Sequence, residues 1–135
     1  MADREEIYAA LEKHFGFSSF RDGQYEIISA ILDGRDTLSV MPTGAGKSLC
    51  FQLPAVLSEG TTLVISPLIS LMKDQILSLR ERGIKAATVN SSESREKIRS
   101  IMKNAAYGAY RLLYVAPERI NTDDFLQLIK KAHNR

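Results

Sequence analysis

Apolar residues at helical spacing predict two helices in the first third of the chain. The first covers roughly residues 4–15, and Gly16 can end it in a left-handed conformation. The second passes through residues 25–32 and is closed by Gly34. Asp22 is positioned to cap its start through a side-chain oxygen.

Short apolar runs then alternate with further helical patterns. Strands are predicted at residues 37–41, 62–66, 86–89 and 111–115, and helices near residues 47–57, 68–82, 93–105 and 123–132. Ser91 or Ser92 is expected to cap the third of these helices, and Asn121 or Thr122 the fourth. Strands that are apolar throughout and separated by helices pair in parallel, with helices on both faces of the sheet. The fold class is therefore α/β.

Length and composition limit the class of protein. A chain of 135 residues has room for one domain or part of one. Its 44% hydrophobic and 25% charged residues exclude a disordered, collagen-like or membrane-spanning chain. The charged start, with no apolar stretch behind it, argues against a secretory signal and predicts an intracellular protein. Cys50 is the single cysteine and is expected to be a small buried hydrophobe, and His14 and His133 make no zinc cluster.

Charge is distributed unevenly along the chain. Residues 1–60 carry 5 Lys/Arg and 9 Asp/Glu, a net charge of −4, whereas residues 61–135 carry 13 and 7, a net charge of +6. The stretch 80–111 is especially cationic and could meet a polyanion. A solvated helix face explains the same residues equally well.

One segment has the composition of a phosphate-binding loop. Its residues are Thr43, Gly44, Ala45, Gly46, Lys47 and Ser48. The glycines let backbone N–H groups turn inward around a phosphate, and the helix that follows adds the positive end of its dipole. Lys47 would reach the β- and γ-phosphates as the catalytic lysine, and the Ser48 hydroxyl would ligate Mg²⁺. The general pattern has glycine where this chain has Met41, so a plain glycine turn with an exposed lysine is the alternative.

Four blocks of sequence together resemble consecutive motifs of RecQ-family DNA helicases. They are FGFSSFRDGQ at 15–24, MPTGAGKSLCFQLPA at 41–55, SPLISLMKDQ at 66–75 and LLYVAPER at 112–119. The resemblance implies a three-layer, RecA-like P-loop NTPase fold with a mostly parallel sheet, incomplete at the carboxyl end. It makes residues 1–135 a single partial domain, the first half of the ATP-binding motor domain. The implied cofactors are ATP and Mg²⁺, and the implied partners are single-stranded or forked DNA and the remainder of the motor.

The resemblance also assigns roles to the first block. By similarity, Phe17 stacks on adenine, Gln24 hydrogen-bonds its polar edge, and Arg21 lies beside the nucleotide. Without the family, Phe17 and Phe20 would be interpreted as core aromatics and Gln24 as a surface residue. Asp22 stands where the family pattern leads us to expect proline.

By similarity to the family, further residues that follow the strands are expected to contact DNA, and they lie at the edge where open α/β sheets bind their ligands. These residues are Ser66, Pro67, Lys73, Asn90, Ser91 and Arg119. For Arg119, an ion pair with an aspartate or glutamate is the competing interpretation.

Three functions remain open at this stage. The first is the nucleotide-binding part of a 3′ to 5′ DNA helicase, from a family that acts in DNA repair and recombination. The second is a truncated nucleotide- or DNA-binding module without motor activity. A small P-loop kinase is the third, although it has no reason to carry the first and third blocks. The family's Asp-Glu-Ala-His motif does not occur in these 135 residues, so we expect this chain alone to bind ATP without helicase-like hydrolysis.

Overall fold

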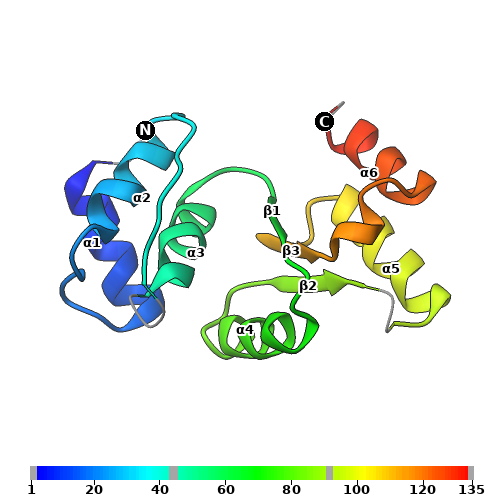
Figure 1. The fold of residues 1–135 in the computed structure, drawn as a ribbon, viewed down its shortest axis with the longest axis horizontal. Helices are drawn as coiled ribbons and strands as arrows, with labels where there is room; N and C mark the ends of the chain where they lie inside the picture. Colours follow the sequence, from blue (N-terminus) through cyan, green and yellow to red (C-terminus); the bar gives the residue numbers. More distant parts are fainter. Residues whose placement is uncertain (1–2, 43–45, 91–92, 134–135) are drawn as a thin grey trace. The chain divides into compact units, whose positions relative to one another are not determined.

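The computed structural model describes residues 3–42, 46–90 and 93–133 (Figure 1). The chain forms two compact units, residues 1–59 and residues 60–135. Within the described residues, no helix combines the length and the apolar character needed to cross a membrane.

The first unit is helical. It contains α1 (Arg4–Ala10), which continues as a π-helical turn over Leu11–Phe15, then α2 (Gln24–Leu32) and α3 (Lys47–Leu57). All three expected helices are therefore present. The backbone of Gly16 is left-handed, with φ of 75°, and ends the first helix as expected. Asp3, which the sequence analysis overlooked, caps α1 by accepting a hydrogen bond from the Glu6 N–H at 2.9 Å.

Apolar side chains from all three helices form the core of the first unit. The buried residues are Ile7, Ala10, Leu11, Phe15, Ile28, Cys50, Leu53 and Ala55. An aromatic cluster fixes the loop between α1 and α2, because Phe20 packs edge-on against Tyr8 at 5.0 Å between ring centroids. The Arg4 guanidinium lies 5.0 Å from the Tyr8 ring centroid and 4.9 Å from that of Tyr25. Phe20 thus joins a cation–aromatic cluster at the surface.

Two expectations for the first unit are wrong. Residues 37–41 form no strand, and Leu38 and Val40 are each 94% exposed. A β-ladder requires a neighbouring strand, and the first unit contains none among its described residues. Asp22 does not cap α2 either. Gly23, with φ of 85°, occupies the cap position, and no side chain caps that end.

The second unit is built on a parallel sheet of three strands. They are β1 (Thr62–Ile65), β2 (Ala86–Val89) and β3 (Leu112–Val115), in the order β1-β3-β2. Thr62 and Ala86 flank Leu112 on either side, and the register continues to Ile65 and Val89 beside Val115. Three of the four expected strands and their parallel pairing are confirmed.

Helices cover both faces of this sheet, as expected for an α/β fold (Figure 1). They are α4 (Ile69–Glu81) on one face, and α5 (Arg95–Ala106) with α6 (Asp123–His133) on the other. On the α4 face, the Tyr114 hydroxyl donates to Gln75 Oε1 at 2.7 Å. On the opposite face, Leu113 and Val115 pack with apolar residues of α5 and α6. The central strand β3 is therefore buried on both sides.

The caps of α5 and α6 refine the expectations. Ser94 caps α5 by accepting from the Lys97 N–H at 3.2 Å, so neither expected serine is the cap. Ser91 and Ser92 themselves lie outside the described residues. Thr122 takes the cap position of α6, where its carbonyl accepts from the Leu126 N–H at 3.0 Å. The Thr122 hydroxyl donates to the Arg119 carbonyl at 2.7 Å, so a side-chain cap by Asn121 or Thr122 stays a prediction.

An ion pair secures the start of α6. Asp124 Oδ2 lies 2.7 Å from Nη2 of Arg119, the last residue of the 3₁₀ turn at Pro117–Arg119. Burial raises the pKa of Asp124. Hydrogen bonding by Thr122, the charge of Arg119 and the Phe125 N–H together outweigh burial and hold the pKa below its ordinary value. The folded state therefore favours the ionised carboxylate.

We expect Asp124→Asn to destabilise the chain at neutral pH, because it removes the charge while keeping an oxygen for the Phe125 N–H. Since the folded pKa is depressed, this stabilisation is complete above the unfolded value and is lost as pH falls through the folded one. Urea unfolding should therefore show a gap between the two proteins at pH 7 that closes below pH 3.8. Asp123→Asn is the matched control, and an equal, pH-independent loss in both variants would contradict the assignment.

Candidate functional site

The amino terminus of α3 supplies the described part of the phosphate-binding loop. Gly46 caps this helix in a left-handed conformation with φ of 79°, and Lys47 is its first residue. The Lys47 side chain is exposed and forms no ion pair within the described part of the chain, whereas Ser48 is half-buried. Thr43, Gly44 and Ala45 lie outside the described residues. An ammonium group and free N–H groups at a helix start suit a phosphate.

Gln24 connects the loop before α2 to the start of α3. Its Nε2 donates to the Gly46 carbonyl at 3.0 Å, and its Oε1 accepts from the Arg21 N–H at 2.8 Å. The side chain is only 3% exposed, so it is not the surface residue that the sequence alone suggested. Both polar atoms of the amide are thus held in place from within the first unit. Three residues expected at the nucleotide are brought together here: Arg21, Gln24 and Gly46.

Space around Gly46 is tight as well as conformationally restricted. A Cβ placed on Gly46 would collide with Gln24 Nε2 and would lie 3.9 Å from Arg21 Cδ. Glycine is therefore required at position 46 for two separate reasons. Its positive φ strains other residues, and its missing side chain leaves room for the Gln24 amide.

Phe17 presents an aromatic face near the end of the first helix. Its N–H donates to the Leu11 carbonyl at 3.4 Å, and its ring is 53% exposed. The core-aromatic interpretation is therefore wrong for Phe17. An aromatic ring held by its backbone and open to solvent can stack on a base.

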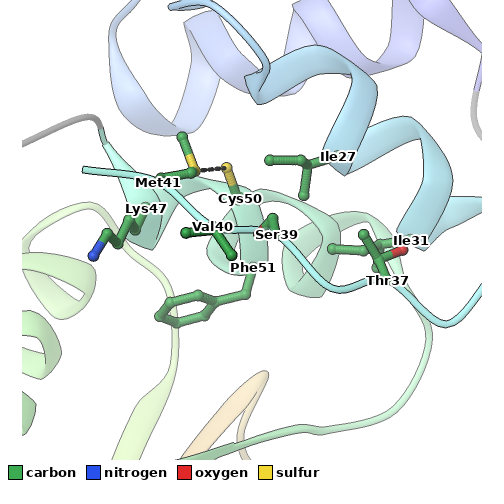
Figure 2. Close-up of a pocket in the computed structure, with 9 residues that line it drawn as sticks. All are labelled: Ile27, Ile31, Thr37, Ser39, Val40, Met41, Lys47, Cys50 and Phe51. Carbon is green, nitrogen blue, oxygen red and sulfur yellow. Dashed lines mark hydrogen bonds between the residues drawn. The ribbon is translucent and has the colours of Figure 1, made fainter. Parts of the chain in front are cut away.

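A cavity of about 380 Å³ lies between α2, α3 and the extended segment before the loop. Figure 2 shows its lining, in which Met41 Sδ and Cys50 Sγ approach to 3.9 Å while Lys47 points its amino group away from the apolar side chains. Burial raises the pKa of the Cys50 thiol, so it stays protonated as the small hydrophobe expected. The described residues contain no group of three metal-ligating side chains. Apolar side chains make up most of the cavity lining beside Lys47.

In the second unit, the parallel sheet brings the expected DNA contacts to one edge. Ser66, Asn90 and Arg119 each follow the carboxyl end of a strand, and those ends coincide in a parallel sheet. Pro67 and Lys73 are exposed after β1, and Ser91 lies outside the described residues.

Three of these side chains form a hydrogen bond or an ion pair within the protein. Asn90 is fully buried, and its Nδ2 donates to Thr88 Oγ1 at 3.2 Å. Arg119 forms the ion pair with Asp124 that was the competing interpretation, and its buried Nε has no partner within the described residues. Ser66 Oγ accepts from the Leu68 N–H at 3.2 Å and shapes the turn into α4.

Two contacts were missed by sequence reasoning. They are Gln24 with Gly46 and Gln75 with Tyr114. Only the last had a sequence signal, since a tyrosine in a wholly apolar strand needs a partner for its hydroxyl.

Gly46→Ala should destabilise the chain by more than the cost of a left-handed alanine, which is about 1–2 kcal/mol, because it also displaces Gln24. Gly23→Ala is the matched control, since Gly23 also has a positive φ but has no heavy atom within 4 Å of the added Cβ. Urea unfolding of both variants measures the difference. Equal losses would show that the Gln24 contact contributes nothing.

Comparison with known proteins identifies the family of this chain. The sequence profile of the DEAD/DEAH box helicases matches residues 21–134. The chain is 51% identical over 121 residues to the ATP-dependent DNA helicase RecQ of Haemophilus influenzae, covering 90% of this chain and 20% of that protein. It is 47% identical over 121 residues to RecQ of Bacillus subtilis, covering 89% and 20%.

A plant relative, ATP-dependent DNA helicase Q-like 2 of Arabidopsis thaliana, is 45% identical over 123 residues, covering 89% of this chain and 17% of that protein. The chain thus spans about one fifth of the length of these relatives. Its α/β architecture, with a small open parallel sheet, is consistent with part of a RecA-like helicase domain. The chain belongs to the DEAD/DEAH box helicase family and is a relative of its RecQ members.

Proposed function

We propose that this chain is the ATP-binding part of a RecQ-like 3′ to 5′ DNA helicase that acts on DNA inside the cell. Residues 1–135 would be the first half of its first motor domain, and the remainder of the motor would be the partner. The proposal rests mainly on the Gln24 amide. This amide connects residues 15–24, which would bind adenine, to Gly46 at the start of α3. An ATP site can use the amide of this buried glutamine to bind the base, whereas a plain glycine turn gives the amide no function.

We assign binding of the ATP phosphates to the residues from Thr43 to Ser48. Lys47 has an exposed ammonium group at the first position of an eleven-residue helix, so charge and helix dipole act on the same anion. The Ser48 hydroxyl fits a hard cation, whose other ligands would be phosphate oxygens and water. Mg²⁺ held there would neutralise phosphate charge.

At the base end, Gln24 would distinguish adenine from guanine. A carboxamide has two donor hydrogens and two acceptor lone pairs, and the contacts with Gly46 and Arg21 use one of each. The remaining hydrogen and lone pair match adenine, which offers an acceptor nitrogen beside an amino group. Guanine offers two acceptors on the same edge and would leave the amide oxygen without a donor. Phe17 would add stacking, and Arg21 a cation beside the nucleotide.

For DNA, the proposal uses the carboxyl edge of the sheet in the second unit. Ser66, Pro67 and Lys73 would lie along a strand's backbone, together with Asn90 and Ser91. Asn90 is buried, so its role would be to shape the loop rather than to touch a phosphate. Arg119 would have to share its guanidinium between Asp124 and DNA.

Lys47→Ala should weaken ATP binding about tenfold or more, because a charge-assisted hydrogen bond to phosphate contributes roughly 1.5–3 kcal/mol. Titration of a fluorescent ATP analogue with Mg²⁺ present measures this loss. Lys13→Ala removes an equally exposed lysine from the same unit and should leave affinity unchanged. Identical curves for the two variants would refute the phosphate role.

Gln24→Ala should reduce the preference for ATP over GTP towards one, since it removes the group that reads the base. The ratio of the two affinities is the measurement, because it is insensitive to a general loss of stability. Gln52→Ala is the matched control, as Gln52 is also buried, at 8% exposed, but lies within α3. Equal affinities of the unmutated chain for ATP and GTP would refute adenine recognition.

A further inference from the structure

A groove runs between α5 and α6 on the face of the sheet opposite α4. Its volume is about 310 Å³, and its floor consists of the buried side chains of Met102, Ala106 and Leu128. On the α5 side it is lined by Arg99, Lys103 and Tyr107, and on the α6 side by Asp124, Gln127 and Lys131. Residues spaced by three or four positions share one face of a helix, so each wall is a continuous stripe. Figure 1 shows the two helices side by side. We refer to this feature as the α5–α6 groove.

The charge of the α5–α6 groove is unbalanced. Arg99, Lys103 and Lys131 are exposed, and none forms an ion pair within the residues that the structure describes. The single carboxylate, Asp124, is already neutralised by Arg119 at 2.7 Å. Arg99 and Lys103 are like charges four residues apart, an arrangement that destabilises an isolated helix. Three cations therefore line one groove, and the one carboxylate among its lining residues is paired with Arg119.

An aromatic ring stands at one end of the same groove. Tyr107 is the residue that ends α5, and its side chain is 67% exposed. Cations that follow a phosphate backbone, together with an exposed aromatic ring that stacks on an unpaired base, are the two components of a single-strand binding surface. A duplex keeps its base faces covered, so it would leave the ring unused.

We propose that the α5–α6 groove binds single-stranded nucleic acid, with Arg99, Lys103 and Lys131 on its phosphates and Tyr107 stacked on a base. From Arg99 to Tyr107 the helix rises about 12 Å. A stretch of that length can contact a short run of phosphates along a single strand. This surface rests on the DNA-binding part of the proposed function and extends it beyond the residues that follow the strands.

The groove lies apart from the sheet edge to which Ser66, Asn90 and Arg119 belong. Because α5 leads from the carboxyl end of β2 to the amino end of β3, Tyr107 lies towards the opposite edge of the sheet. Asp124 lines the groove and holds Arg119, so the two surfaces meet at this ion pair. A single strand of DNA that passes the carboxyl ends of the β-strands could continue along the groove towards Tyr107.

The test is the salt dependence of binding to a fluorescein-labelled oligothymidylate, measured by anisotropy with the 135-residue chain. Each phosphate contact to a single strand contributes about 0.7 to the slope of log affinity against log salt concentration. Arg99→Gln/Lys103→Gln/Lys131→Gln should therefore reduce the slope by about 2. The matched control Lys85→Gln/Arg95→Gln/Lys130→Gln removes the same charge from exposed positions outside the groove and should leave the slope nearly unchanged.

Tyr107→Ala should weaken oligothymidylate binding about fivefold or more, while Tyr107→Phe retains it and a duplex of equal length is unaffected. Two results would contradict the proposal that the groove binds a single strand. One is an equal loss of salt slope in the groove and control variants. The other is a Tyr107→Ala effect on affinity that is as large for the duplex as for oligothymidylate. An oligoglutamate peptide that competes through the three cations while Tyr107→Ala has no effect would contradict it as well. If oligothymidylate binds but the groove variants do not change its binding, only this proposal fails. If it does not bind at all, the DNA-binding part of the proposed function fails too.

Discussion

Buried polar side chains must find hydrogen-bond partners, and in this protein those partners decide where the site residues lie. Gln24, at 3% exposure, is fixed by Arg21 and Gly46, so a segment 22 residues away from the glycine is tied to the start of α3. In the second unit, the Tyr114 hydroxyl binds Gln75 and thereby fixes α4 on the sheet. An unsatisfied buried amide or hydroxyl costs about 1–3 kcal/mol, comparable with a large share of a small unit's stability.

Much of the fold could be predicted because it follows from local spacing. The helices after residues 46, 68 and 94 and the three parallel strands come from apolar periodicity, and Gly16 ends the first helix by its own conformational freedom. Residues 37–41 show where this reasoning stops. Their composition favours a strand, but a strand exists only beside a neighbour, and composition does not supply one.

The candidate site was predictable by residue type and less so by contact. Lys47 and Gly46 take the positions in the helix start that the glycine pattern implied. The Gln24 bridge was not predictable, because it depends on how closely α2 and α3 pack and on the absence of a Cβ at Gly46. Asp22 and Ser91 failed as caps for a related reason: several polar residues precede each helix, and the backbone selects among them through geometry that sequence does not record.

The surroundings of each charged side chain in the second unit indicate whether its charge is balanced. The net charge of +6 in residues 61–135 is a diffuse property of sequence, and two ion pairs, Lys97 with Glu93 and Arg119 with Asp124, account for part of its cations. The remaining cations on the stripes of α5 and α6 lie over an apolar floor, where fewer water molecules screen them than on a convex surface. Asp124 is held by Arg119, so the carboxylate among the described lining residues of the groove is already paired. Repulsion among these cations lowers the stability of the free protein, and an anionic strand would relieve it on binding.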